Sequence, residues 1–94
     1  MDTKVIENVA QKRFELALPD GAIAAAYYRL DPEGRLVLIH TEVPAEYAGH
    51  GIATRLAEGT FDLVRQSGRK VVLQCPFMGL FFQKHPDYAD IVAG

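Results

Sequence analysis

Three things are scarce in this chain of 94 residues: cysteine, long apolar runs and an excess of charge of either sign. Its one cysteine, Cys75, has no partner within the chain, which is consistent with a reducing compartment. Ten Lys and Arg residues stand against twelve Asp and Glu residues, and the formal net charge is −2. This balance argues against a nucleic acid partner and against an anionic membrane surface.

The apolar stretches are all shorter than the roughly 20 residues that a membrane-spanning helix needs. One of the longest runs only from Ala22 to Tyr28, and the N-terminal MDTKVIENVAQKR lacks the apolar centre of a signal peptide. We therefore expect a cytoplasmic protein. With 49% hydrophobic residues, the chain has enough for one domain over residues 1–94 and too few for two.

The first half of the chain carries the alternating pattern of β-strands. Phe14 and Leu16, for example, alternate with Arg13 and Glu15, which is the period of a half-buried strand. Three strands are predicted, over residues 13–18, 21–30 and 35–43. A fourth strand is predicted over residues 5–9, where the pattern is weaker. The turn Asp31-Pro32-Glu33-Gly34 predicts a tight hairpin, so the strands should be antiparallel.

The period of the apolar residues changes at Ile52. From there they recur at spacings of three and four, which predicts an amphipathic helix of about four turns. Gly68 is suited to the left-handed conformation just past its end. Residues 70–75 predict another strand, ended by Pro76, so that strand, helix and strand form a crossover with parallel strands. A short helix over residues 77–84 follows.

The segment PAEYAGHG, between the third strand and the long helix, is the main candidate for a binding site. It places Gly49 and Gly51 directly before the helix. Unpaired amide groups and the helix dipole attract a phosphate at such an N-terminus, and glycine lets the main chain approach it closely. A plain strand-to-helix turn would use the same glycines for their dihedral angles, so the loop by itself fits both interpretations.

The position of this loop favours a ligand site. In open sheets, ligands bind beyond the carboxyl ends of parallel strands, which here lie near Val43 and Cys75. Alternation along the third strand places His40 and Glu42 on the same face as Leu38, so that this face turns polar as the strand ends. We therefore expect one cleft to contain His40, Glu42 and Cys75.

The run HTEVPAEYAGHGIATRL resembles the strand, bulge, loop and helix of GNAT acetyltransferases, whose coenzyme A loop follows Gln/Arg-x-x-Gly-x-Gly/Ala. Together with Cys75-Pro76-Phe77 and His85-Pro86-x-Tyr88, it is similar to a small stand-alone group of GNAT-like proteins of about ninety residues. The resemblance covers residues 8–92. It implies an α+β fold with α/β-like layering: a mixed, mostly antiparallel sheet, one long helix in a strand–helix–strand crossover and a short C-terminal helix.

The resemblance further implies an acetyl-CoA-dependent N-acetyltransferase. The sheet would separate between the strands that end at Val43 and Cys75, with pantetheine in the gap. The residues expected to hold acetyl-CoA or coenzyme A are Val43, Ala48, Gly49, His50, Gly51, Ile52, Ala53, Phe82 and Lys84. The acceptor would be an amine, either of a small molecule or of a lysine or N-terminus of a peptide. We expect a monomer or weak dimer, and no metal site, because the His and Cys residues lack metal-ligand spacing.

The chain departs from the GNAT pattern at three points. Glu46 stands where the loop usually has Gln or Arg, and Ala48 where relatives are often basic, so His50 is the nearby side chain that can add positive charge. Phe82 occupies the place of a tyrosine that often protonates the departing thiolate, and Tyr88 is a candidate to replace it. The N-terminal helices by which larger relatives shape an acceptor pocket are missing, so the acceptor end should be open.

Acetyl transfer to an amine requires removal of a proton from the amine, and Glu42 and His40 are the candidate bases, directly or through a water. Alternatively, Glu42 pairs with an arginine and His40 donates to a backbone carbonyl. Cys75 is a candidate to accept the acetyl group in a ping-pong route, or it packs as a small hydrophobe. Two other functions stay open: a coenzyme-binding or interaction module without turnover, and a structural partner that binds another chain at its sheet edge.

Overall fold

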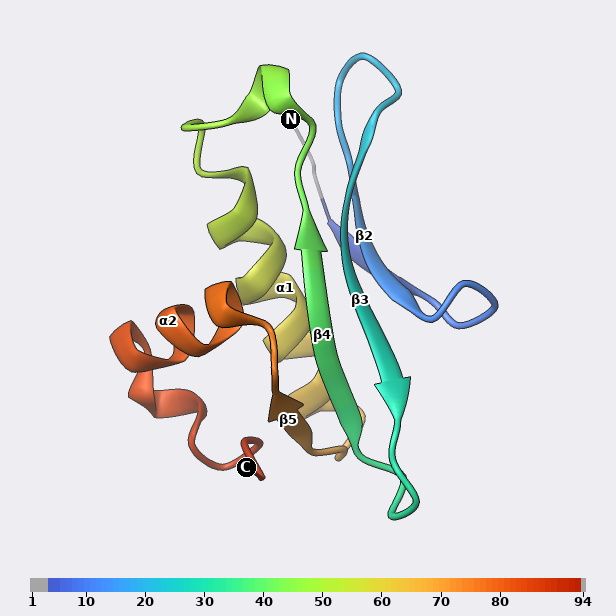
Figure 1. Ribbon diagram of the computed structural model, residues 1–94, viewed down its shortest axis with the longest axis vertical. Helices are drawn as coiled ribbons and strands as arrows, with labels where there is room; N and C mark the ends of the chain where they lie inside the picture. The colour runs from blue at the N-terminus through green and yellow to red at the C-terminus, as the bar shows by residue number, and fades with distance from the viewer. Residues whose placement is uncertain (1–3, 94) are drawn as a thin grey trace.

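The computed structural model describes residues 4–93, and its strands form one sheet in chain order. The strands are β1 (Val5–Asn8), β2 (Arg13–Ala17), β3 (Ile23–Leu30), β4 (Leu36–Glu42) and β5 (Val71–Leu73), the helices are α1 (Ile52–Gln66) and α2 (Pro76–Lys84), and the short 3-10 helices are η1 (Ala45–Tyr47) and η2 (Pro86–Tyr88). The first four strands are antiparallel, and β5 is parallel to β4 after the α1 crossover (Figure 1). The predicted α+β fold is confirmed.

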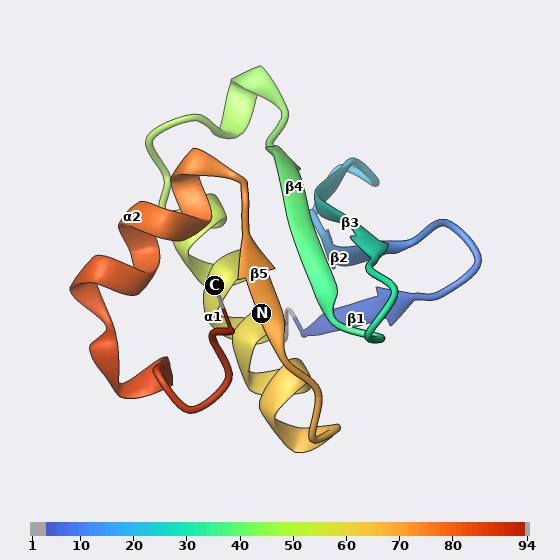
Figure 2. The same cartoon turned by 60° about the horizontal axis from the view of Figure 1, so that its bottom comes forward.

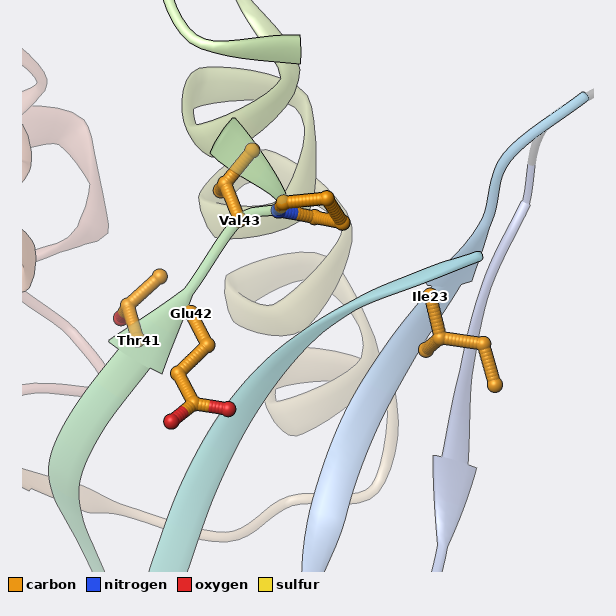
Figure 3. Close-up of a pocket in the computed structure, with 5 residues that line it drawn as sticks. Ile23, Thr41, Glu42 and Val43 are labelled. Atoms are coloured by element: carbon orange, nitrogen blue, oxygen red, sulfur yellow. The ribbon is translucent and has the colours of Figure 1, made fainter. Parts of the chain in front are cut away.

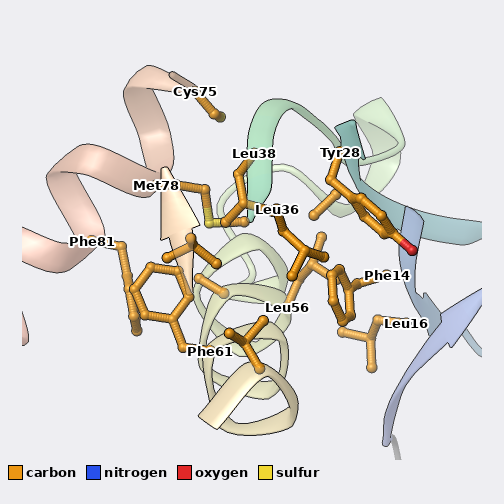
Figure 4. Close-up of a cluster of buried hydrophobic side chains, with 14 of the residues drawn as sticks. Phe14, Leu16, Tyr28, Leu36, Leu38, Leu56, Phe61, Cys75, Met78 and Phe81 are labelled. Carbon is orange, nitrogen blue, oxygen red and sulfur yellow. The ribbon is translucent and has the colours of Figure 1, made fainter. Parts of the chain in front are cut away.

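Both helices contribute to one apolar core. Helix α1 lies along β1, β2 and β3, and α2 packs beside α1 and against β4 and β5 (Figure 2). The core contains alternate residues of the strands and the inner sides of both helices, among them Phe14, Leu36, Leu56 and Phe61 (Figure 4). Burial of this apolar surface is the main source of stability. Because both helices lie on the same side of the sheet, no helix within residues 4–93 covers the other face of β3 and β4.

Helix α1 follows the predicted apolar period and ends as expected, with Gly68 left-handed at φ 72°. The presence of glycine at position 59, inside the helix, is explained by packing that the sequence did not reveal. A Cβ built at Gly59 would lie 2.3 Å from Cγ2 of Val5, so only glycine lets β1 come this close to the helix. Within residues 4–93, neither helix has the length and apolar character to cross a membrane.

Strand β1 is fixed to the far end of α1 by a charged cluster. The carboxylate of Glu7 accepts two hydrogen bonds from Arg69, at 2.7 and 3.1 Å, and one from the hydroxyl of Tyr28 at 2.5 Å. The hydrogen bond from Arg69 is the main cause of the lowered pKa of Glu7. Burial, followed by the bond to Glu7, raises the pKa of Tyr28 to about 12. These contacts join segments that are far apart in the sequence.

Strand β5 is shorter than predicted, because its pairing with β4 stops early. The last pair is Leu38 with Leu73, and the amides of Gln74 and Cys75 then both donate to the carbonyl of Leu38, at 3.0 and 2.8 Å. Beyond this point the chain after β5 turns away from β4 into α2, while β4 continues toward the loop that leads into α1 (Figure 1). The separation of the two strands, which the resemblance implied, is therefore confirmed.

A β-bulge in β4 reverses the faces of the strand beyond Leu38. Residues 27 and 28 of β3 are consecutive, whereas their partners on β4 are His40 and Leu38, so Ile39 has no partner on β3. One extra residue shifts every later side chain to the opposite face. His40 and Glu42 therefore do not share the face of Leu38. The prediction that simple alternation places them in one cleft with the core-facing residues was wrong.

Candidate functional site

The turn into α1 depends on two left-handed residues. Gly49 has φ 81° and Gly51 has φ 75°, a region that residues with a side chain enter only with strain. Gly51 is the N-cap of α1, and no side chain caps the helix. The glycines are thus required by the backbone, as the plain-turn interpretation states. The same conformation also leaves the start of the helix open to solvent.

Five amide groups at this turn have no hydrogen-bond partner among the described residues: those of Gly49, Gly51, Ile52, Ala53 and Thr54. The amides of Ala48 and His50 are used within the turn, where they donate to Ala45 and Tyr47 at 3.1 and 3.2 Å. No Asp or Glu lies in the first turn of α1. The positive end of the helix is therefore not occupied by the protein's own carboxylates, and it is suited to a phosphate.

The separation of β4 from β5 frees part of the β4 backbone. On β3, the amide of Tyr28 donates to the carbonyl of Lys12, which directly precedes β2, at 3.0 Å. The backbone groups of the neighbouring Tyr27 and of its partner His40 therefore face each other between β3 and β4. Alternation then directs the backbone groups of Thr41 and Val43 away from β3 and into the gap. An extended amide-containing chain in the gap has these groups available for hydrogen bonds.

Cys75 borders the same gap at the start of α2. Its side chain is buried, with 4% exposure, and forms no disulfide. Its Sγ lies 3.3 Å from Oγ1 of Thr41, close enough for a hydrogen bond in which either group donates. Sequence reasoning did not single out Thr41, because without the bulge this residue would have been assigned to the other face of β4.

His40 and Glu42 form a pair on the face opposite to Thr41. Nε2 of His40 lies 2.9 Å from Oε2 of Glu42, and the imidazole stacks on Tyr27 with ring centroids 5.6 Å apart. The hydroxyl of Tyr27 donates to Glu42 at 3.5 Å. The hydrogen bond with His40 is the main cause of the lowered pKa of Glu42. Thus the hydrogen-bonding partner of His40 is Glu42 and not a backbone carbonyl, and the ion-pair partner of Glu42 is a histidine and not an arginine.

This pair continues a row of polar side chains across the open face. Arg13 donates to the hydroxyl of Tyr27 at 3.4 Å and to Glu15 at 2.5 Å. The side chains of His40 and Glu42 are 56% and 60% exposed, so both can reach a molecule from solvent. In the described part of the chain, no three His, Cys, Asp or Glu side chains are grouped so that they could hold a metal ion.

A groove of about 470 Å³ at the end of β4 brings the two faces together. It is lined by Ile23, Thr41, Glu42, Val43 and Pro44. The side chains of Thr41 and Glu42 leave the strand in different directions there (Figure 3). The groove therefore touches both the gap beside Cys75 and the open face that carries the His40–Glu42 pair.

Residues 13–91 match the model of the GCN5-related N-acetyl-transferases, which includes the turn into α1 and both strands that border the gap. The chain belongs to the GCN5-related N-acetyltransferase family. The match covers all of the site described above, from β2 to the segment beyond η2.

Curated proteins with similar sequences include Protein NATD1 of Gallus gallus and of Mus musculus, each 39% identical over 49 residues. That alignment covers 52% of this chain and 44% of the relative. Protein NATD1 of Danio rerio is 38% identical over 55 residues, with 56% of this chain and 50% of the relative covered. The chain spans about half the length of the curated relatives it matches.

A solution NMR structure of a GCN5-like protein from Staphylococcus aureus has the same fold. The TM-score is 0.71, and the superposition covers 97% of this chain and 88% of the other. Sequence identity is 22%, so this likeness establishes the fold alone.

In this member of the GCN5-related N-acetyltransferase family, the hydroxyl of Tyr88, the candidate general acid, already has a partner within the protein. Its hydroxyl donates to Asp62 at 2.8 Å, and its ring packs edge-on against Phe61 with centroids 5.1 Å apart. Burial, followed by the bond to Asp62, raises the pKa of Tyr88 to about 12. The hydroxyl thus serves the packing of η2 on α1, and its role as a general acid stays a prediction. His85 follows α2 as its C-cap.

Proposed function

We propose that this chain binds acetyl-CoA and transfers its acetyl group to an amine. The observation that carries the proposal is the set of unoccupied amides at the start of α1, close to the end of β4 where the sheet opens. Membership of the GCN5-related N-acetyltransferase family supports it. Coenzyme A has two polar parts that this arrangement fits. Its diphosphate fits the start of α1, and its pantetheine amides fit the gap, where backbone groups of β4 are free.

The cofactor assignments follow from the free groups. The diphosphate is held by the amides of Gly49, Gly51, Ile52 and Ala53, and the exposed side chain of His50 adds a ring N–H beside them. The amides of pantetheine pair with the backbone groups of Thr41 and Val43. The thioester then lies in the gap beside Cys75.

Transfer requires that the amine lose a proton, attack the carbonyl carbon of the thioester and expel the thiolate of coenzyme A. The new bond joins nitrogen to carbon, and the bond that breaks joins carbon to sulfur. The lowered pKa keeps Glu42 ionised near neutral pH, so it is a weak base by itself. We assign proton removal to His40, with Glu42 orienting the imidazole and stabilising its charged form.

Cys75 offers a second route, because its Sγ borders the gap and lies 3.3 Å from Oγ1 of Thr41. In this route Sγ attacks the carbonyl carbon of the thioester, the bond from that carbon to the coenzyme A sulfur breaks, and coenzyme A leaves as a thiol with the proton that Cys75 gives up. The amine then attacks the acetyl carbon on Cys75, the bond to Sγ breaks, and the proton lost by the amine restores the thiol of Cys75. Intact mass after incubation with acetyl-CoA distinguishes the routes. A single acetyl adduct that Cys75→Ala removes supports the covalent route, and an adduct that persists in Cys75→Ala, or none at all, assigns direct transfer.

Binding is tested first, by calorimetry with coenzyme A and with Thr54→Glu and Thr54→Gln variants. Thr54 is exposed in the first turn of α1, and a Glu there reaches the free amides, stabilises the helix and repels a diphosphate. We expect Thr54→Glu to lose at least about tenfold in affinity without a lower melting temperature. Thr54→Gln has the same size without the charge and should bind normally. Absence of binding to the wild type at millimolar coenzyme A contradicts the proposal.

A coenzyme-binding or interaction module without turnover is the second candidate. It is favoured by one observation: Phe82 replaces the usual tyrosine, and Tyr88 is held by Asp62. Release of free thiol from acetyl-CoA, measured with a panel of amines and lysine peptides, separates the two functions. Thiol release above the rate of background hydrolysis supports the transferase, and binding without thiol release supports the module.

A further inference from the structure

The two edges of the sheet differ in whether a neighbouring segment covers them. At the β5 edge, the amide of Val71 donates to the carbonyl of Ile91 at 2.8 Å, and the carbonyl of Val71 accepts from the amide of Ala93 at 2.7 Å. At the opposite edge, β1 pairs with β2, and no other segment within residues 4–93 forms a strand pair with it (Figure 2). The sheet can therefore be extended at β1.

The direction of the backbone groups on β2 determines which groups of β1 are used. The amide of Tyr28 on β3 donates to the carbonyl of Lys12, just before β2. In an antiparallel ladder the groups of successive residues point to alternate sides. The backbone groups of Arg13 and Glu15 therefore point away from β3 and toward β1.

Two residues of β1 carry unpaired backbone groups at this edge. Ile6 and Asn8 lie opposite the two β2 residues just described and use their groups there. The amides and carbonyls of Val5 and Glu7 consequently point outward, and none of them has a backbone partner within residues 4–93. An edge strand with such groups can pair with a strand of another chain.

The side chains of β1 do not protect this edge. Edge strands of natural proteins commonly carry a lysine, a proline or a bulge that prevents pairing. The sequence of β1 is VIEN, and it pairs with β2 residue for residue without a bulge. Its charged residue, Glu7, is held by Arg69 and Tyr28. Val5 packs on α1, so alternation places Ile6 on the open face, where it is 57% exposed.

Helix α1 leaves the edge accessible, because the surface beside β1 is hollow. A groove of about 330 Å³ lies there, with Val5 on one wall and Gly59, Leu63 and Gln66 of α1 on the other. A neighbouring strand at this edge has room for the side chains that it directs toward α1.

We propose that β1 pairs in antiparallel direction with β1 of a second copy of this chain, with the two Ile6 residues opposite each other. In this register, Val5 of each copy lies opposite Glu7 of the other. Because these are the residues whose groups point outward, every free amide and carbonyl of both edges forms a hydrogen bond. The two Ile6 side chains come close together on the open face, as a pair without backbone hydrogen bonds.

Other registers suit the same strand less well. A shift of one residue places the outward groups opposite groups that β2 already uses. A shift of two residues in one direction places two Glu7 carboxylates opposite each other, which is destabilising. In the other direction it takes Glu7 out of the paired segment Val5–Asn8. The strand is thus complementary to itself in one register, which favours a second copy as the partner. The inference does not rest on the proposed function, because β1 lies at the edge opposite the gap.

The association should be weak, because an edge of four residues buries less surface than the roughly 1,200–2,000 Å² of stable interfaces. Sedimentation equilibrium between about 10 µM and about 1 mM should show monomer and dimer with a dissociation constant on the order of 100 µM. Ile6→Lys places two like charges opposite each other and should raise this constant at least about tenfold. Leu30→Lys is the matched control, because Leu30 is similarly exposed, at 53%, but lies at the end of β3, an inner strand.

A monomer at every concentration overturns the inference and leaves the edge to a strand of another protein. A dimer that Ile6→Lys does not weaken, or that Leu30→Lys weakens equally, uses another surface and also overturns it.

Amide hydrogen exchange, followed by NMR on the wild type, tests the register without a substitution. Between the two concentrations, exchange at Val5 and Glu7 should slow by about fourfold, in line with the fall in free monomer. The amides of Ile6 and Asn8 should slow less, because they already donate to β2. Equal slowing of these amides, or no slowing at Val5 and Glu7, contradicts the proposed pairing.

Discussion

The two faces of the sheet differ in what they bury and in what they expose. The face under α1 and α2 is apolar, and Phe14, Leu16 and Leu38 on it have at most 1% exposure. The opposite face carries His40 and Glu42, which are more than half exposed. At the bulge at Ile39, the side chains of β4 change from facing the core, as Leu38 does, to facing solvent, as His40 does. One strand can thus anchor the core with its first half and hold a candidate site with its second half.

This difference predicts that stability and activity respond to different substitutions. Changes on the covered face should unfold the protein, and changes on the open face should alter only its chemistry. The predictions below test that separation, beginning with the largest expected effect.

Phe61→Ala on the covered face should lower the free energy of unfolding by about 3–5 kcal/mol, because it removes a fully buried ring and leaves a cavity between the helices. Urea denaturation followed by circular dichroism measures the change. Glu42→Gln is the matched variant on the open face, and it should change stability by less than about 0.5 kcal/mol. Similar losses in both variants would show that the open face also carries the fold.

Glu42→Gln should lower kcat/KM for acetyl transfer by about a hundredfold, because the neutral amide cannot stabilise a protonated His40. The affinity for coenzyme A should stay the same, since Glu42 lies away from the start of α1. Steady-state kinetics and calorimetry measure the two quantities. Glu46→Gln, an exposed change in η1, is the control for loss of charge. A comparable loss of activity in both variants would remove the special role of Glu42.

The two glycines inside helices should respond to alanine with opposite signs. Gly59→Ala places a Cβ 2.3 Å from Val5 and should destabilise the protein by about 1–3 kcal/mol. Gly79→Ala in α2 meets no atom within 4 Å and should stabilise it by about 0.5–1 kcal/mol through helix propensity. Thermal melts of both variants measure the effect. A stabilising Gly59→Ala would contradict the close approach of β1 to α1.

Glu7→Gln should lower the free energy of unfolding by about 1–2 kcal/mol at neutral pH, because Arg69 loses its carboxylate partner. The pKa of Glu7 in the folded protein is below its ordinary value of 4.5. Its contribution is therefore complete above that value and is lost as the pH falls through the folded pKa. Denaturation at pH about 7 and about 3 should show the wild type and the variant converging in acid. A difference that does not shrink in acid would assign the effect to packing. Glu33→Gln is the control, because Glu33 pairs with Arg35 but its side chain is 70% exposed. This variant should change the free energy of unfolding little at either pH.

Most of the fold could be predicted from the sequence, because the helix and the strands have clear periods. Alternation around Phe14 and the switch of period at Ile52 correctly gave the sheet, the crossover and the direction of β5. The shortened β5 could not be predicted, since it depends on the carbonyl of Leu38 accepting two amides from another part of the chain. The pair of Glu7 and Arg69 likewise spans 62 positions in the sequence.

The candidate site was predicted less well, and the reason is one residue. The run LVLIHTE contains no glycine or proline that marks a bulge, so regular alternation was the natural interpretation. The structure moves His40 and Glu42 away from Cys75 and brings Thr41 to it instead.

The carbonyl of Leu38 has a consequence for how a ligand enters. Its oxygen accepts hydrogen bonds from the amides of Gln74 and Cys75, which directly follow β5. The hydrogen bonds between β4 and the β5 segment therefore end before the gap begins. A guest chain that slides between them breaks no rung of the ladder and needs no strand to part. The gap between β4 and β5 forms when the protein folds. The conformational entropy of ordering this gap is therefore lost on folding and is not lost again when a ligand binds.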